Sequence, residues 1–169
     1  GGPHPSILPE QTLKSDYVDI VCLGEGDVVF YKLVKAIEER RGLSEVKGIA
    51  FKDNHKIAVN PPEPLIDVEE LLPVPWELIE VENYIHPDMY LKKSSRTLDI
   101  GQTSRGCPFN CGFCCSGSLS MRKWRAMSVE RSLQAIIEPV KRFKLNGIWI
   151  RDDEFYIDRE RASRICEGI

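Results

Sequence analysis

The sequence lacks several features that would indicate a particular class of protein. No Asp or Glu occurs between Ile100 and Val129, although the 169-residue chain contains 26 acidic residues. No histidine follows His86, which argues against a zinc site built from Cys and His in the second half of the chain. No apolar run approaches the roughly 20 residues of a membrane-spanning helix, and no charged-then-apolar leader indicates export.

Composition narrows the class further. Hydrophobic residues make up 42% and charged residues 29% of the chain, as in ordinary globular domains. The net charge of −3 argues against a general nucleic-acid-binding surface. The length suits one domain or parts of two. Because the chain starts at Gly1-Gly2 without Met and stops inside an expected helix, we expect a piece of a longer protein.

Three cysteines with the spacing C-x3-C-x2-C, Cys107, Cys111 and Cys114, carry the strongest functional signal. Three soft thiolates can hold three irons of a 4Fe-4S cube, and a fourth iron without a protein ligand is open to a small molecule. Turn-forming residues between the ligands let a short loop curl around a cluster. The acid-free surroundings lower the cost of burying an anionic cluster, and they contain Arg105, Arg122, Lys123 and Arg125.

The other cysteines, Cys22, Cys115 and Cys166, bear on the alternatives. A structural zinc site usually has a second C-x2-C pair, and a disulfide framework belongs to small secreted chains. An electron carrier needs four ligands per cube, and Cys115 could become the fourth only with strained geometry because it adjoins Cys114. We expect Cys115 to be a small buried thiol. Clustered free cysteines suit a reducing cytoplasm.

The stretch Cys107-Pro-Phe-Asn-Cys-Gly-Phe-Cys114 resembles the signature of radical S-adenosylmethionine (SAM) enzymes. The resemblance implies a 4Fe-4S cluster on the three cysteines, with its open iron bound to the amino and carboxylate groups of SAM. It also implies reductive cleavage of SAM to a 5′-deoxyadenosyl radical, and it places Phe113 against the adenine. Taken on its residue type alone, Phe113 is equally suited to core packing.

The N-terminal part predicts a strand, a glycine turn and a helix. The apolar run 17–23 ends at Gly24-Glu-Gly26, and a helix from Asp27, its expected N-cap, to about Arg41 follows. Its apolar face is expected to comprise Phe30, Leu33, Val34 and Ile37.

This N-terminal part, together with Gly1-Gly-Pro-His-Pro5, resembles the end of the cobalamin-binding domain that precedes the barrel in one radical SAM subgroup. The resemblance implies contacts of Gly1 and Gly2, and of Gly24 and Gly26, with cobalamin. The residues themselves do not establish that cobalamin is bound.

A hairpin and a proline-rich connector are expected next. Residues 48–52 and 56–59 flank the turn Asp53-Asn-His55, and five prolines then occur between Asn60 and Trp76. A short helical turn is expected near Val68, and His55 and His86 are expected on the surface.

The C-terminal part predicts two β/α units. A strand at 98–103 leads into the cysteine loop, a helix starts at the N-cap Ser128, and a strand at 148–150 ends before Asp152-Asp153. A last helix starts at the N-cap Asp158. Chemistry in such folds lies at the carboxyl ends of the strands.

In the radical SAM family, units of this kind form a (β/α)6 partial barrel. The pattern Asp152-Asp153-x-Phe155 is similar to that of the cobalamin subgroup, and the resemblance implies that Asp152 or Asp153 holds the SAM amino group, an apt pairing of carboxylate and ammonium. Helix capping and solvated charge are the plainer roles for the same residues.

The expected fold class is therefore α/β, with three parts. Residues 1–42 are expected to form the C-terminal part of a Rossmann-like cobalamin-binding domain, and residues 43–96 a hairpin and proline-rich linker. Residues 97–169 are expected to form the first units of a TIM-like partial barrel.

The leading hypothesis is a radical SAM enzyme that uses a 4Fe-4S cluster, SAM and, optionally, cobalamin for methyl transfer or ring formation. Its partners would be a small-molecule substrate and a reductant such as flavodoxin or ferredoxin, with neither nucleic acid nor a membrane span. Two alternatives remain open at this point. One is a methylthiotransferase acting on transfer RNA or a ribosomal protein, although only Cys22 precedes the triad. The other is a non-enzymatic electron-transfer or zinc-stabilised interaction module.

Overall fold

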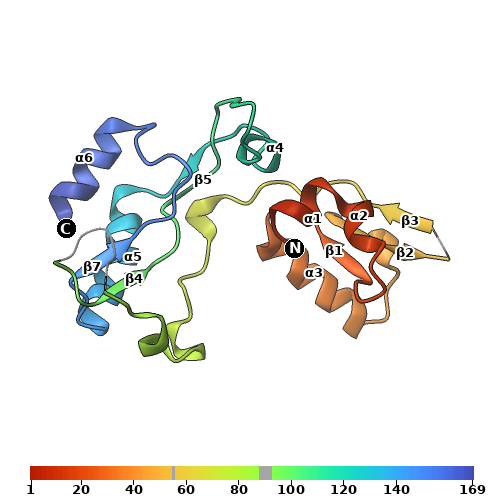
Figure 1. The fold of residues 1–169 in the computed structure, drawn as a ribbon, viewed down its shortest axis with the longest axis horizontal. Coiled ribbons are helices and arrows are strands. Elements are labelled where there is room, and N and C mark those ends of the chain that lie inside the picture. Colours follow the sequence, from red (N-terminus) through yellow and green to blue (C-terminus); the bar gives the residue numbers. More distant parts are fainter. Residues whose placement is uncertain (55, 88–92) are drawn as a thin grey trace. The chain divides into compact units, whose positions relative to one another are not determined.

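The computed structural model describes residues 1–54, 56–87 and 93–169, which form two compact units (Figure 1). Unit 1 consists of residues 1–66 and 108–123, and unit 2 of residues 67–107 and 124–169. His55, expected on the surface, lies outside the described residues, whereas His86 is exposed as expected.

Unit 1 is built on an antiparallel sheet with the strand order β1-β2-β3. The strands are β1 (Ile20–Cys22), β2 (Ile49–Asp53) and β3 (Lys56–Val59). β2 is the central strand, and its pairing with both neighbours buries Ile49, Ala50 and Phe51. The expected hairpin is therefore present, and it shares one sheet with the strand that precedes the glycine turn.

Helices cover both faces of this sheet, because successive strand residues point to opposite sides. Ile49 and Phe51 pack against Val29 and Leu33 of α3 (Gly26–Glu38). On the other face, Ala50 and Val21 pack against Leu13 of α2 (Pro9–Leu13). The remaining helical segments of unit 1 are α1 (Pro3–Ile7), the 3-10 turn η1 (Leu43–Glu45) and α4 (Ser116–Leu119).

The expected buried face of α3 was wrong by about one position. Leu33 is buried as expected, but it shares the core with Val29 and Ala36, whereas Phe30 is 61% and Ile37 55% exposed. Val29, Leu33 and Ala36 also recur at helical spacing, so the apolar residues of α3 fit two adjacent helix faces. Which of these faces is buried depends on the packing against the sheet.

The ends of α3 also differ from the expectation. Asp27 lies inside the first turn, and the N-cap position belongs to Glu25. The helix stops at Glu38, before the expected Gly42, because Arg40 adopts a left-handed conformation with φ 54°. The Arg41 amide then donates to the Ala36 carbonyl at 2.8 Å, a helix end usually made with glycine.

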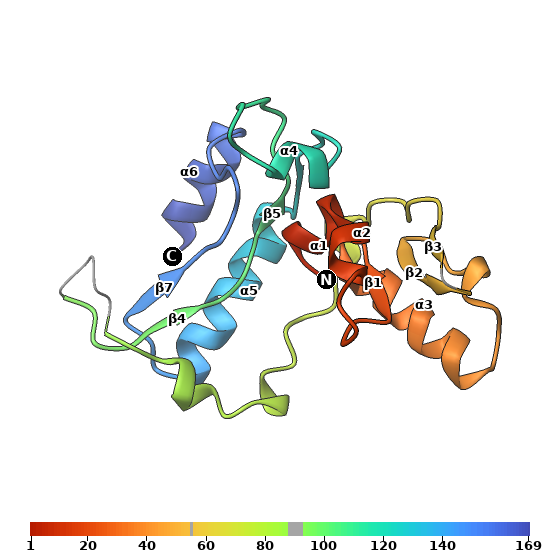
Figure 2. The same cartoon turned by 45° about the vertical axis from the view of Figure 1, so that its right-hand side comes forward.

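Unit 2 contains two β/α units in succession (Figure 2). β4 (Thr97–Asp99) and β7 (Gly147–Trp149) pair in parallel, with Leu98 opposite Ile148. Helix α5 (Val129–Arg142) connects them and α6 (Arg159–Gly168) follows β7. This is the β/α order that the sequence predicts.

A second, shorter pair of strands brackets the cysteines in the chain. β5 (Ser104–Arg105) pairs antiparallel with β6 (Arg125–Ala126), so Ser104 lies opposite Ala126. The strand expected over 98–103 ends early, because β4 stops at Asp99 and β5 begins only at Ser104. Gly101, between them, has a φ of 85°.

The core of unit 2 lies between the sheet, the two helices and the connector. Ile136 and Ile165 are completely buried, and Trp76 of the proline-rich connector joins them. The connector also contains the expected turn at Val68, within η2 (Val68–Glu70), and two further 3-10 segments, η3 (Trp76–Leu78) and η4 (Val81–Tyr84).

Both predicted N-caps in unit 2 are confirmed. The Ser128 side chain accepts a hydrogen bond from the Arg131 amide, and the Asp158 side chain accepts one from the Arg161 amide. Within the described ranges, none of the helices has the length and apolar character needed to cross a bilayer.

Candidate functional site

The three motif cysteines lie outside helices and strands. Cys107 follows β5 and Gly106, whose φ is 84°, whereas Cys111 and Cys114 precede α4. None of the three forms a disulfide with another described residue; Cys107 is half-buried, and Cys111 and Cys114 are exposed. The Cys114 amide donates to the Cys111 carbonyl at 3.1 Å, which forms a tight turn between these two residues.

The donor chemistry of this motif fits an iron–sulfur cluster, because three thiols are the ligands that such a cluster prefers. In the part of the chain that the structure describes, no three His, Cys, Asp or Glu side chains are gathered at one metal position. The assignment of Cys107, Cys111 and Cys114 as cluster ligands therefore remains a prediction from their type and spacing.

The segment that follows the cysteines is held by its own contacts. Arg122 Nη2 donates to the Asn110 side-chain oxygen at 2.6 Å, and the Arg122 amide donates to the Gly117 carbonyl at 2.9 Å. A Cβ atom at Gly117 would lie 3.0 Å from the Phe109 carbonyl oxygen, so the close approach favours glycine.

Phe113 is 95% exposed, so it does not serve the core packing that was the plainer alternative. An exposed aromatic ring on a ligand loop is available for stacking on a flat heterocycle. Cys115 is exposed at the N-cap position of α4, and the expectation of a buried thiol was wrong.

Asp152 is surrounded by hydrogen-bond donors. Its Oδ1 accepts from the amides of Thr103 (2.6 Å) and Ser104 (2.9 Å), and its Oδ2 accepts from the two hydroxyls, each at 2.7 Å. A carboxylate offers about four lone-pair sites, and these four bonds use all of them. Asp153, the other residue predicted to hold the SAM amino group, is exposed.

Arg161 is a functional candidate that the sequence patterns did not indicate. It is 6% exposed in α6, and its guanidinium donates to the carbonyls of Thr103 and Met127 (both 2.8 Å) and to Ser132 Oγ (3.0 Å). Burial lowers the pKa of Arg161, and the carboxylates of Asp152, Asp158 and Glu69 oppose that shift. Only its position in an otherwise apolar helix stripe could have indicated burial.

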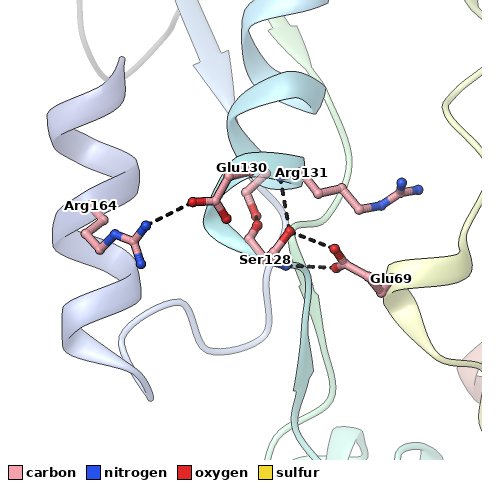
Figure 3. A network of polar contacts seen from close by, with 6 residues as sticks. Glu69, Ser128, Glu130, Arg131 and Arg164 are labelled. Carbon is pink, nitrogen blue, oxygen red and sulfur yellow. Dashed lines mark hydrogen bonds and ion pairs between the residues drawn. The ribbon is translucent and has the colours of Figure 1, made fainter.

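The N-terminal end of α5 carries a further polar cluster (Figure 3). Glu69 accepts hydrogen bonds from the Ser128 amide (2.8 Å) and the Ser128 hydroxyl (2.7 Å). These bonds lower the pKa of Glu69, an effect that desolvation partly opposes. On the side facing α6, Glu130 forms an ion pair with Arg164 at 2.9 Å.

Two of the glycines predicted to contact cobalamin lie near the end of β1. A Cβ atom at Gly1 would lie 3.6 Å from the Cys22 carbonyl, and the Gly24 amide donates to Ser6 Oγ of α1 at 2.9 Å. Gly2 and Gly24 have positive φ angles of 101° and 70°, whereas Gly26 begins α3. Their contact with cobalamin remains a prediction.

Comparison with curated proteins finds relatives over nearly the whole chain. An uncharacterized methyltransferase of Pyrococcus horikoshii is 34% identical over 164 residues, which cover 96% of this chain and 34% of the relative. The anaerobic magnesium-protoporphyrin IX monomethyl ester cyclase of Rubrivivax gelatinosus is 29% identical, over 100% of this chain and 30% of the relative. The chain thus spans about a third of these relatives. No family profile matches it.

Solved structures give the same result for the fold. The cobalamin-dependent SAM radical enzyme OxsB, with aqua-cobalamin and SAM bound, is 28% identical with a TM-score of 0.68, over 97% of this chain and 23% of its own. The radical SAM methyltransferase TsrM from Kitasatospora setae, with cobalamin and a [4Fe-4S] cluster bound, reaches a TM-score of 0.67 at 16% identity, over 99% and 32%. The latter likeness bears on the fold alone.

The α/β fold, with a C-x3-C-x2-C motif after the first strand of a parallel β/α unit, is similar to that of radical SAM enzymes. The relatives found over nearly the whole chain are cobalamin-dependent radical SAM methyltransferases and cyclases. The methylthiotransferase alternative has no support among these relatives.

Proposed function

We propose that the protein containing this chain is a cobalamin-dependent radical SAM enzyme that modifies a small molecule. The observation that carries the proposal is the cysteine motif, placed after the first strand of a parallel β/α unit in a chain whose relatives are enzymes of this kind. Methyl transfer is the favoured reaction because the relatives include several methyltransferases, and ring formation is the second candidate because they also include cyclases.

Cys107, Cys111 and Cys114 would hold the cluster as thiolates, and the acid-free stretch around them lowers the cost of its negative charge. When bound, a 4Fe-4S cluster with one open iron binds SAM and supplies the electron that cleaves its sulfonium. Phe113, fully available to a ligand, would stack on the adenine. The exposed Asp153 carboxylate would accept hydrogen bonds from the SAM ammonium.

Cobalamin would approach the glycine-rich end of unit 1, where Gly1, Gly2, Gly24 and Gly26 present backbone without side chains. A Cβ atom added at Gly2, Gly24 or Gly26 would meet no atom within 4 Å, so a flat ligand could approach this backbone closely. The electron would come from a reductant of the flavodoxin or ferredoxin type, and the cytoplasm would supply the reducing environment.

Anaerobic reconstitution of the full protein with iron and sulfide tests the proposal. We expect about four iron atoms and four sulfides per chain, an EPR signal from the reduced cluster that changes when SAM is added, and 5′-deoxyadenosine or a methylated product with a strong reductant. A single bound zinc in place of iron, or a cluster whose EPR signal ignores SAM, would contradict the proposal.

A further inference from the structure

The two ends of the cysteine-bearing stretch are held by one polar network, in which every hydrogen-bonding side chain except the half-buried Asp152 is buried. Asp152 binds the amides and hydroxyls of Thr103 and Ser104, just before Cys107, and Arg161 binds the carbonyls of Thr103 and Met127. The Met127 amide donates to the Thr103 carbonyl at 2.9 Å, which completes the connection between the two ends. We call these residues, with Ser132, the Asp152–Arg161 network.

The network contains more buried polar groups than are needed to pair two strands of two residues each. Thr103 and Ser104 are each 1% exposed, and Arg161 Nη1 is buried without a hydrogen-bond partner among the described residues. Burying a guanidinium is costly unless its hydrogen bonds are satisfied and carboxylates lie near it. A buried guanidinium bound in this way favours one backbone conformation, because any other conformation would leave the buried charge without its hydrogen-bond partners.

The network also changes the interpretation of Asp152. A carboxylate meant to bind the SAM ammonium needs an oxygen facing the ligand, but both Asp152 oxygens already accept two bonds from strand β5 and its preceding residue. Asp153, directly after it, is exposed. Of the two adjacent carboxylates, Asp152 is therefore bound within the fold and Asp153 is the exposed one.

We propose that Asp152 and Arg161 are positioning residues that fix the backbone on both sides of the cysteine motif, and thereby the orientation of Cys107 as a cluster ligand. This inference rests on the proposed function. Asp152 orients Thr103 and Ser104, which lie shortly before Cys107 in the chain. Arg161 ties the Thr103 carbonyl to the carbonyl of Met127, where the chain returns from the motif and enters α5.

The test uses the full protein with Asp152→Asn, Arg161→Lys and a matched pair at Thr103. Thr103→Ser keeps the hydroxyl that binds Asp152 but loses a methyl group, whereas Thr103→Val keeps the volume but loses the hydroxyl. Arg164→Gln is the control, because Arg164 lies on the same helix, is exposed and pairs with Glu130 outside the network.

The readouts are iron per chain, the EPR spectrum of the reduced cluster without SAM, and the rate at which a chelator removes iron. For Asp152→Asn we expect iron loss to a chelator to accelerate about tenfold or more, since a half-buried carboxylate loses charge-assisted bonds. We expect an altered SAM-free spectrum for Asp152→Asn and Arg161→Lys. Thr103→Val should be more affected than Thr103→Ser, and Arg164→Gln should match the wild type.

Three other results would contradict either the positioning role or the proposed function. If Asp152→Asn weakens only SAM binding and leaves the SAM-free spectrum unchanged, Asp152 is a direct ligand and the positioning role is wrong. If Thr103→Ser is the more affected of its pair, packing and not the hydrogen bond matters. The Thr103 pair also decides the matter if Asp152→Asn does not fold. A wild-type protein that binds no iron contradicts the proposed function itself.

Discussion

The cysteine motif and the Asp152–Arg161 network beside it in the chain differ sharply in burial. Phe113 is 95% exposed and Cys111 and Cys114 lie open to solvent, whereas Thr103 and Ser104 are 1% and Arg161 6% exposed. The first region exposes groups that can bind ligands. The second is mostly buried, and its side chains bind one another and the backbone.

The difference in burial indicates that different residues stabilise the fold and bind ligands. A ligand-binding loop must leave its donors accessible, so it cannot be stabilised by burying them. The neighbouring residues can be buried, because most of their polar groups, Arg161 Nη1 excepted, have hydrogen-bond partners. Substitutions in the loop should therefore weaken cofactor binding and leave the stability of the fold unchanged. Substitutions in the network or the core should lower the stability of the fold, with or without an effect on cofactor binding.

The largest expected effect is the loss of the cluster on replacing one motif cysteine. Cys107→Ala, Cys111→Ala or Cys114→Ala each removes a ligand from a cluster that has only three, so we expect less than about a tenth of the wild-type iron. Iron and sulfide analysis after anaerobic reconstitution measures it. Cys115→Ser is the control and should retain the full cluster, and a normal iron content in the triple variant would refute the ligand assignment.

The second-largest expected effect is a loss of stability on shortening a buried side chain. Ile136→Ala removes a completely buried side chain from the core of unit 2, and we expect a loss of about 3 kcal/mol in the free energy of unfolding. Urea unfolding followed by circular dichroism measures it. Gln134→Ala, an exposed position on the same helix, should change stability by less than about 0.5 kcal/mol. Equal effects at both positions would mean that α5 is not packed as described.

Phe113→Ala should separate binding from stability. Because the ring is exposed, we expect no change in the midpoint of unfolding, but the KM for SAM should rise up to about tenfold through the loss of stacking on adenine. Tyr17→Ala, at a ring that is 96% exposed, is the matched control and should change neither quantity. A destabilised Phe113 variant with an unchanged KM would reverse the assignment.

The smallest effect concerns pH. The Ser128 hydrogen bonds lower the pKa of Glu69, so this contact stabilises the fold above the ordinary glutamate pKa, and the stabilisation is lost as pH falls through the lowered value. Solvent screening at this exposed carboxylate keeps the contribution below about 1 kcal/mol. Thermal unfolding of wild type and Glu69→Gln should differ near neutral pH and converge in acid. A difference that grows on acidification would show the opposite sign.

Much of the fold could be predicted because its signals are local. Ser128 and Asp158 cap their helices as their residue types suggest, and the order of strands and helices in unit 2 follows from apolar runs and punctuation. The α3 face and its C-terminus were less accessible to prediction. Adjacent apolar faces compete there, and Arg40 takes a conformation usually left to glycine.

The candidate site divides in the same way. The cysteine motif is local in sequence, so its residue types and spacing suffice to find it. The partners of Asp152 and Arg161 are 29 to 58 residues away in the chain, and no short pattern encodes them. The sequence therefore singled out Asp152, either as a SAM ligand or as a capping or solvated carboxylate, but it gave no sign of the bonds to Thr103 and Ser104.

The pairing of β5 with β6 has a consequence for how a cluster could assemble. Pairing of Ser104 with Ala126 closes the intervening chain into a loop through the backbone alone. Three thiols confined to such a loop have lost part of the chain entropy that a free polypeptide must still give up to gather them. The strand pair thus raises the effective concentration of the thiols toward one another, and variants that loosen it should slow cluster assembly even where the finished cluster is intact.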